Sequence, residues 1–171
     1  MIIDVDKKIE ELSNTVCDIC EHFPLILKYG IQCDHITELG VREVGSLWGW
    51  IGSRPKTIRC YDKEESVNIV HARDTAESLG IDFQFYLANV HDVEIEETDL
   101  LFIDTDHAYY NMKTELTLHG NKARKFIMFH DTAWAEDMNQ AIQEFMQDNP
   151  HWVDEEEVTN NHGMKIIKRL S

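Results

Sequence analysis

Near-continuous apolar segments that end in polar residues constrain the fold of this chain more than any other feature. Residues 99–104 and 125–130 read DLLFID and KFIMFH, so each ends in an acidic or imidazole side chain. Such segments are typical of strands that are buried on both faces, as in a parallel sheet. Residues 35–39, 57–62 and 82–87 form three further segments with a strand pattern.

Helical patterns lie between these strands. Five segments are predicted to be helical: 6–20, 45–53, 63–79, 109–123 and 135–147. Alternating strands and helices indicate a parallel sheet with helices on both faces. Residues 152–158 and 162–169 are predicted to close the chain as an antiparallel hairpin. The expected fold class is therefore α/β, a doubly wound, mostly parallel sheet of seven strands. We expect one domain over 1–171, with a helical segment at 1–30 and the core at 35–171.

The charge of the chain excludes several classes of partner. The 171 residues include 16 Lys and Arg and 32 Asp and Glu, which gives a formal charge of −16. Nucleic acids and anionic membrane surfaces both require basic residues, so neither is an expected partner. The apolar runs are too short to span a bilayer, and the N-terminus has no signal-peptide pattern. These features predict a cytoplasmic location.

Four cysteines are too few and too scattered for a disulfide framework, so reduced thiols are expected. Cys17 and Cys20 form a C-x-x-C motif near the end of the first predicted helix. A zinc site would need a second such pair, and a thioredoxin-type motif would open a helix. We therefore expect these cysteines to be helix residues with one or both thiols packed inward.

The ends of the first two predicted strands favour a cofactor that contains adenosine. Gly40 permits a tight turn after the first strand, and Gly45 lets backbone approach a ligand or pack against a helix. Asp62 ends the second strand 22 residues after Gly40, a distance at which an acid commonly binds a ribose diol. The alternative is an ordinary strand-to-helix turn, with Asp62 as the cap of the next helix.

The fourth and fifth strands end in acids and imidazoles. Asp104 and His107 follow the fourth strand, and His130 and Asp131 follow the fifth. If these strands are neighbours, their side chains meet at one crevice, because the carboxyl ends of parallel strands share an edge. Carboxylates with imidazoles suit a divalent cation, and a free imidazole can act as a general base. The alternative is a set of helix caps, at Asp106 and Asp131, with a hydrogen-bonded structural histidine.

These motifs resemble those of the class I S-adenosylmethionine (SAM)-dependent methyltransferases. Within that group the chain is most similar to the branch of macrolide sugar O-methyltransferases and cephalosporin-hydroxylase-like proteins. The similarity lies in the segments 38–46 (ELGVREVGS), 101–109 (LFIDTDHAY) and 129–132 (FHDT) and extends over about 36–152. It implies a Rossmann-like fold and an O-methyltransferase that acts on a hydroxyl of a small molecule or sugar.

The resemblance also implies roles for individual residues. Glu38, Gly40 and the turn that contains Arg42, Gly45 and Ser46 would surround the methionine part of the cofactor. Asp62 would bind the ribose, and Asn89 and Val90 would lie near the adenine. Asp104 would belong to the cofactor site and would also be a Mg²⁺ ligand. His107 would be the catalytic base, and the N-terminus of the following helix should lower its pKa and keep it neutral.

The chain departs from the family pattern at two positions. His130 stands where metal-dependent members have an acid next to the one that matches Asp131, and Val44 stands where a glycine is usual. Magnesium prefers oxygen ligands, so a set of Asp104, His130 and Asp131 favours a softer divalent cation. Both departures also fit a non-catalytic protein that binds a cofactor or a partner. A nicotinamide-dependent oxidoreductase is disfavoured by the incomplete glycine pattern and the terminal hairpin.

No long insertion between the strands supplies a lid over an acceptor. Either the acceptor is small, or a second subunit of a homo-oligomer completes the pocket. Several aromatic residues could line that pocket or simply pack: Trp48, Trp50, Tyr109, Tyr110 and Trp134.

Overall fold

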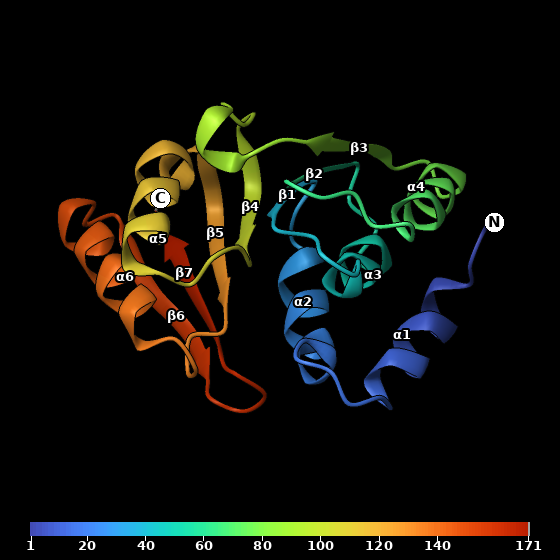
Figure 1. Ribbon diagram of the computed structural model, residues 1–171, viewed down its shortest axis with the longest axis horizontal. Helices are drawn as coiled ribbons and strands as arrows, with labels where there is room; N and C mark the ends of the chain where they lie inside the picture. Colours follow the sequence, from blue (N-terminus) through green and yellow to red (C-terminus); the bar gives the residue numbers. More distant parts are fainter. Residues whose placement is uncertain (171) are drawn as a thin grey trace.

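Seven strands form one sheet in the computed structural model, which describes residues 1–170 (Figure 1). The strands are β1 (His35–Leu39), β2 (Thr57–Asp62), β3 (Asp82–Leu87), β4 (Thr98–Ile103), β5 (Ala123–His130), β6 (Trp152–Val158) and β7 (Met164–Arg169). Their order is β3-β2-β1-β4-β5-β7-β6, with β1 to β5 parallel and β7 antiparallel to both neighbours. The predicted doubly wound sheet with a terminal hairpin is confirmed.

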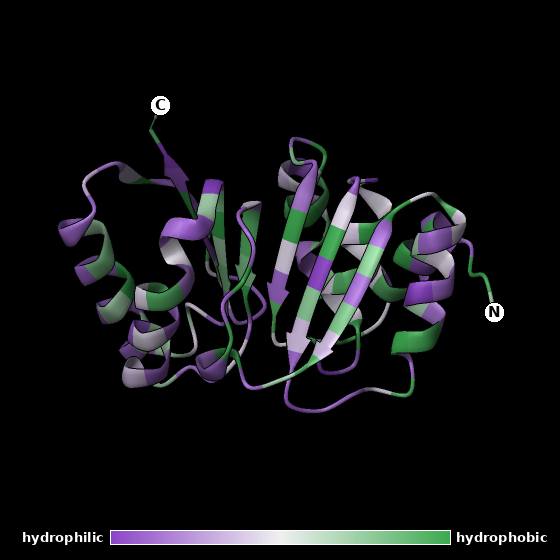
Figure 2. Cartoon of the chain, turned by 90° about the horizontal axis from the view of Figure 1, so that it is seen from above, coloured by the Kyte–Doolittle hydropathy of each residue, from purple (hydrophilic) through white to green (hydrophobic). Residues whose placement is uncertain are grey.

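Two helical layers cover the sheet (Figure 2). One layer contains α1 (Val5–Ser13), α2 (Phe23–Gly30), α3 (Gly45–Gly52) and α4 (Ile69–Ser78). The other contains α5 (Tyr109–His119) and α6 (Glu136–Asp148). Three short 3-10 helices lie between these elements: η1 (Cys20–His22), η2 (Val90–Asp92) and η3 (Gly120–Lys122). Within residues 1–170, no helix has the length and apolar character needed to cross a bilayer.

The N-terminal segment differs from its prediction. The first helix ends at Ser13 instead of continuing to residue 20, and the unpredicted α2 follows. Ser13, Asn14 and Thr15 donate side-chain hydrogen bonds to the carbonyls of the last turn, which satisfies those carbonyls and ends the helix. Two further helices are shorter than predicted, since α4 begins at Ile69 and α5 ends at His119.

The cysteine prediction is wrong for one pair. Cys17 and Cys20 lie in the loop between α1 and η1 and at the start of η1, not within a helix, and they form a disulfide. The early end of α1 is the reason, because the following residues are free to turn back and bring the two sulfurs together. Cys33 and Cys60 are free and buried, as expected of reduced thiols.

The register of the three central strands brings their carboxyl ends to one edge. Leu39 of β1 pairs with Ile103 of β4, and Ile103 pairs with Phe129 of β5. Gly40 follows at φ +85°, and a Cβ atom there would lie 2.1 Å from the carbonyl oxygen of Asp104. Both the backbone conformation and the lack of space therefore require glycine at the first strand end.

Replacing Gly40 by Ala should destabilise the fold strongly. A left-handed conformation costs a non-glycine residue about 1–3 kcal/mol, and the clash with the Asp104 carbonyl adds to it. Gly80→Ala is the matched control, because Gly80 also has a positive φ (+78°) but open space around it. Urea unfolding should show a loss of about 3 kcal/mol or more for Gly40→Ala and about 1 kcal/mol for Gly80→Ala. Equal losses would contradict the close approach of the two strand ends.

Candidate active site

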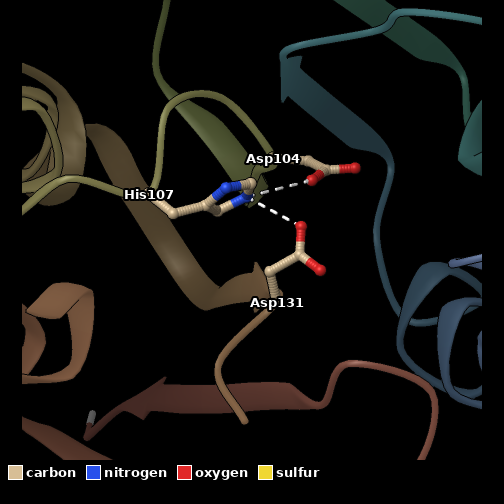
Figure 3. A group of neighbouring side chains, drawn as sticks. All are labelled: Asp104, His107 and Asp131. Atoms are coloured by element: carbon tan, nitrogen blue, oxygen red, sulfur yellow. Dashed lines mark ion pairs between the residues drawn. The ribbon is translucent and has the colours of Figure 1, made fainter. Parts of the chain in front are cut away.

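Asp104, His107 and Asp131 converge at the carboxyl ends of β4 and β5 (Figure 3). Asp104 directly follows β4, Asp131 directly follows β5, and His107 lies in the loop before α5. The Nε2 atom of His107 is 2.8 Å from Oδ2 of Asp131 and 3.7 Å from Oδ1 of Asp104. One ligand atom from each residue lies within 4.8 Å of the others. The predicted convergence of the two strand ends is present.

His130 belongs to the same cluster and is almost completely buried. Its Nδ1 is 3.2 Å from Oδ1 of Asp104 and 3.3 Å from Oδ2 of Asp131. Its Nε2 is 2.9 Å from the carbonyl oxygen of Asp18, which can only accept a hydrogen bond, so Nε2 carries a proton. The His130 ring is thus held between a backbone carbonyl and the two carboxylates.

A fifth residue, His162, reaches this cluster from the β6–β7 turn. Its Nδ1 is 2.9 Å from Oδ1 of Asp131. Asn161 and His162 both have positive φ, as does Asp131 itself at φ 62°. Backbone in this region costs non-glycine residues energy and is concentrated at functional sites. The turn and the end of β5 are therefore bent to bring these groups together.

Electrostatics pair the carboxylates with the imidazoles. Ion pairs with the carboxylates of Asp104 and Asp131 raise the pKa of His107 to about 9. Burial lowers the pKa of His130, but the same two carboxylates outweigh it and raise that pKa to about 10. Burial opposes ionisation of Asp131, yet His107 and His130 hold its pKa below the ordinary value. Without a cation, both imidazoles are therefore protonated at neutral pH.

This result corrects the expectation of a lowered pKa at His107. The expected influence was the N-terminus of α5, whose partial charge is equivalent to about half an elementary charge. Two full carboxylate charges lie within 4 Å of Nε2 and dominate. His107 is thus an imidazolium in the protein free of cations.

The cluster fits a divalent cation. Asp104 and Asp131 offer hard carboxylate oxygens, while His107 and His130 each bring a ring nitrogen toward them. A mixed set of oxygen and nitrogen ligands suits Mn²⁺, Fe²⁺ or Zn²⁺ better than Mg²⁺. His130 also has the environment of a metal ligand, because its second ring nitrogen donates to a backbone carbonyl.

A cavity of about 300 Å³ opens beside the cluster, at the ends of β1, β2 and β4. Five predicted cofactor residues line it: Gly40, Arg42, Asp62, Val90 and Asp104. Asp104 is a member of both the cavity wall and the acidic cluster. The cavity and the cluster are therefore two parts of one site.

Asp62 also shapes the turn after β1. Its Oδ2 accepts hydrogen bonds from the backbone amides of Val41 (2.7 Å) and Arg42 (2.9 Å), and its Oδ1 accepts one from Glu64. Helix α4 begins only at Ile69, so Asp62 does not cap it. Oδ2 thus accepts two hydrogen bonds already, whereas Oδ1 accepts one and keeps a lone pair for a further donor.

The other predicted cofactor residues are not among those that line the cavity. Glu38 is fully buried and accepts a hydrogen bond from Ser46, and burial raises its pKa well above the ordinary value. Gly45 starts α3 and packs against Ile19. The Asn89 side chain caps η2 by accepting from the amide of His91.

Val44 is the left-handed residue at the N-terminus of α3, with φ 61°. A β-branched residue rarely adopts this conformation, which explains why the family pattern has glycine at this position. The backbone turn survives the substitution because the Val44 side chain is buried in the core and its amide donates to the carbonyl of Val41.

Several residues of the cavity and cluster could not be predicted from the sequence. Two of them belong to the cluster, the ring of His162 and the carbonyl of Asp18. Three others line the cavity: Tyr61, Thr105 and Glu115. Glu115 is buried, accepts a hydrogen bond from Thr105, and burial raises its pKa to about 7. Its position in the middle of a helical pattern gave no signal of this role.

The aromatic candidates divide by exposure. Trp48 and Trp50 are buried and pack in the core, whereas Trp134 is 67% exposed and lines an open cavity beside His107. The ring of Trp134 stacks on His162 with centroids 6.2 Å apart. Trp134 is therefore the aromatic residue placed to contact a ligand next to His107.

Solved methyltransferase structures share this fold. A methyltransferase from Geobacter sulfurreducens is 14% identical with a TM-score of 0.69, covering 99% of this chain and 90% of that chain. The SAH-bound methyltransferase PaMTH1 of Podospora anserina is 15% identical with a TM-score of 0.61, covering 99% of this chain and 89% of that chain. The O-methyltransferase TomG of Streptomyces achromogenes, involved in tomaymycin synthesis and solved with SAM, is 11% identical with a TM-score of 0.63, covering 100% and 92%.

No protein-family model and no curated protein sequence matches the chain. At the identities of the solved structures, the similarity establishes the fold. The chain has the Rossmann-like fold of the class I SAM-dependent methyltransferases, as the motifs predicted.

The stability of the cation-free protein should fall as the pH rises from neutral toward 10. Unfolded histidine has a pKa of about 6.5, so a raised folded pKa stabilises the fold fully below that pH and less as the folded groups deprotonate. Urea unfolding in EDTA at pH 7 and pH 10 measures this loss.

Asp131→Asn should remove part of this pH dependence and lower the pKa of His107 toward its ordinary value. Histidine NMR titration gives that pKa directly. Asp106→Asn is the control, because the exposed Asp106 bonds to the Ala108 amide instead. A His107 pKa near 9 in Asp131→Asn would refute the assigned pairing.

Proposed function

We propose that this chain is a SAM-dependent O-methyltransferase that acts on a hydroxyl of a small molecule or sugar, with a divalent cation at the acidic cluster. The observation that carries the proposal is the position of Asp104, which lines the cavity beside the Gly40 turn and also belongs to the cluster. A cofactor in the cavity and an acceptor at the cluster would share this residue. The methyltransferase fold of the chain supports the same assignment.

The residues of the cavity bind and orient the cofactor. Asp62 accepts a hydrogen bond from the ribose diol through Oδ1, Val90 packs near the adenine, and the turn at Gly40 and Arg42 approaches the methionine part. When bound, SAM supplies a sulfonium that makes its methyl group electrophilic. The protein must then hold the acceptor oxygen in line and remove its proton.

In this proposal, Asp104, Asp131 and His130 hold the cation, and it would lower the pKa of an acceptor hydroxyl. His107 takes the acceptor proton. Trp134 and the open cavity beside it place His107 within reach of a ligand, while His130 is buried. His107 can accept a proton only once it has lost its own.

Charge balance allows this change of state. The two carboxylates of Asp104 and Asp131 carry two negative charges, which two imidazolium protons balance in the protein without a cation. With a divalent cation on the carboxylates, His107 and His130 no longer need to be charged. Cation binding and proton release are linked in this way at many metal sites.

One alternative is a non-catalytic protein that binds the cofactor or a partner. Two observations favour it: the strained Val44 at the cofactor turn, and the histidine at position 130. The size of the acceptor, a homo-oligomer that completes the pocket and a cytoplasmic location stay predictions.

Asp62→Ala should weaken binding of SAM and of its demethylated product SAH by about 1–3 kcal/mol, because a charged hydrogen bond to the ribose is lost. Calorimetry with SAM, SAH and NAD measures the affinities. Asp74→Ala is the control, since Asp74 pairs with the N-terminus instead. Unchanged affinity in Asp62→Ala would remove this residue from the site. Wild-type protein that binds NAD but neither SAM nor SAH would refute the cofactor.

His107→Ala should cut methyl transfer to an active acceptor by about 10²–10⁴-fold and leave SAH affinity unchanged. Transfer of the labelled methyl group of SAM to a panel of hydroxyl compounds identifies the acceptor and gives the rate. Asp104→Ala should remove stimulation by Mn²⁺. If turnover ignores chelators and Asp104→Ala alike, the cation has no part in the reaction. SAH binding with no transfer to any acceptor would favour the non-catalytic alternative.

A further inference from the structure

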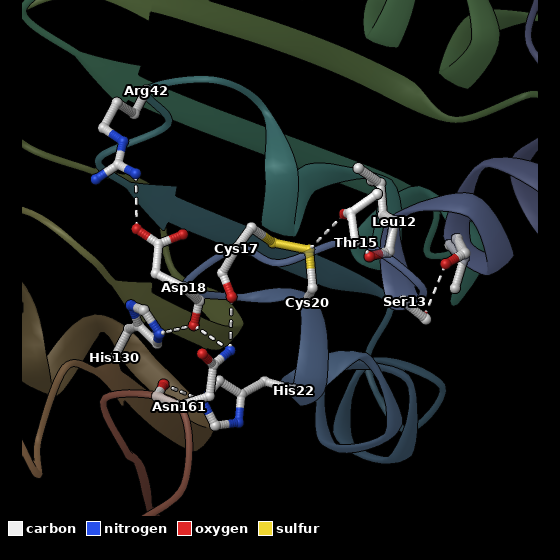
Figure 4. The surroundings of a disulfide bond; sticks show 11 residues. Leu12, Ser13, Thr15, Cys17, Asp18, Cys20, His22, Arg42, His130 and Asn161 are labelled. Carbon is white, nitrogen blue, oxygen red and sulfur yellow. Dashed lines mark hydrogen bonds and ion pairs between the residues drawn. A yellow bond between two sulfur atoms is a disulfide. The ribbon is translucent and has the colours of Figure 1, made fainter.

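The loop closed by the Cys17–Cys20 disulfide touches the candidate active site (Figure 4). Asp18, which lies between the two cysteines, contacts it in two ways. Its carbonyl oxygen is 2.9 Å from Nε2 of His130, and its carboxylate is 2.6 Å from the Arg42 guanidinium. His130 belongs to the acidic cluster and Arg42 to the cofactor cavity. One short loop therefore contacts both parts of the site.

The loop is fixed from the opposite side by the β6–β7 turn. Asn161 donates hydrogen bonds to the carbonyls of Cys17 (2.9 Å) and Asp18 (2.7 Å). Its own carbonyl is 2.9 Å from Nε2 of the buried His22, whose ring lies edge-on against that of His130. The orientation of the Asp18 carbonyl thus depends on the shape of this loop.

The disulfide is the covalent constraint on that shape. No regular helix or strand includes residues 14–19, so hydrogen bonds of secondary structure do not fix them. The disulfide joins two cysteines that are three positions apart in the sequence. Cys17 is partly exposed and its neighbour Val16 is fully exposed, whereas Cys20 is buried. Cys17 is therefore the more accessible cysteine of the pair.

We propose that the Cys17–Cys20 disulfide is a redox-sensitive lock that positions His130 for cation binding through the Asp18 carbonyl. This inference rests on the cation site of the proposed function. In the oxidised chain the carbonyl holds Nε2–H and turns Nδ1 toward Asp104 and Asp131. In the reduced chain the loop is released, and His130 loses the partner that orients it. Asp18 is thus a positioning residue.

The redox step is a thiol–disulfide exchange with a dithiol. A thiolate of the dithiol attacks Sγ of Cys17, the S–S bond breaks, and Cys20 leaves as a thiolate that takes up a proton. The second thiol then attacks the mixed disulfide and releases Cys17. The dithiol is oxidised to a disulfide, and its two electrons reduce the two cysteines.

The test compares oxidised protein with protein reduced by a phosphine and desalted without oxygen. Co²⁺ serves as the probe, because its visible spectrum reports nitrogen ligation, and calorimetry with SAH follows the cofactor site. Reduction should weaken Co²⁺ binding by about 10–100-fold, the usual effect of losing the group that orients a ligating histidine. Circular dichroism checks that both forms are folded.

Two variants separate the lock from other effects. Cys17→Ser/Cys20→Ser should bind Co²⁺ as the reduced protein does and ignore the reductant. Cys33→Ser should still respond, because Cys33 is a free buried thiol away from the loop. If the double variant does not fold, the oxidised and reduced wild type give the same comparison.

NMR of the His130 ring provides a reading that needs no ligand. In oxidised protein the Nε2 proton should be protected from exchange, and in reduced protein it should exchange rapidly. Equal Co²⁺ affinities in the two redox states, or an unchanged His130 signal, would overturn the lock. If oxidised protein binds neither SAH nor Co²⁺, the proposed function fails, and the His130 signal alone then decides whether the disulfide positions this ring.

Discussion

The contact between the ends of β1 and β4 is the constraint on which the site depends. Gly40 turns away from β1 directly against the carbonyl of Asp104, at a distance that excludes any side chain. This contact places the cofactor turn on one side of Asp104 and the acidic cluster on the other. Asp62 then fixes the turn by accepting from the amides of Val41 and Arg42. The cavity and the cluster are neighbours because both include residues at this contact between the ends of β1 and β4. No long loop is needed to connect them.

The strand order also brings two carboxylates close together, and the imidazoles compensate their charge. Asp104 and Asp131 follow adjacent parallel strands, so their negative charges meet in a partly buried place. Two like charges there are stable only with compensating positive charge. His107 and His130 supply it, and this is why their pKa values lie far above that of free imidazole. A cluster balanced by exchangeable protons is also one that a divalent cation can enter without a net cost in charge.

The residues that could be predicted from the sequence are those fixed by strand order. Each of them ends or directly follows a strand whose pattern is visible in the sequence: Gly40, Asp62, Asp104 and Asp131. The parallel topology then brings their positions together. The remaining parts depend on packing between distant segments. His162 reaches Asp131 only through the register of β6 and β7, which the turn-prone Asn160 does not define. The lowered pKa expected for His107 was wrong because a local signal, the helix N-terminus, was weighed without the distant carboxylate.

The end of the first helix is another feature that the sequence pattern did not predict. Its apolar spacing fits a helix up to Cys20, yet the chain leaves the helix at Ser13 because polar side chains satisfy the last carbonyls. Ordering the residues after Ser13 costs conformational entropy. The disulfide and the hydrogen bonds from the Asn161 side chain offset this loss. This order places one carbonyl, that of Asp18, within hydrogen-bond distance of Nε2 of the buried His130 ring. A segment outside the sheet thereby becomes part of the site, since a ring with one nitrogen held by a carbonyl can present only the other to the carboxylates.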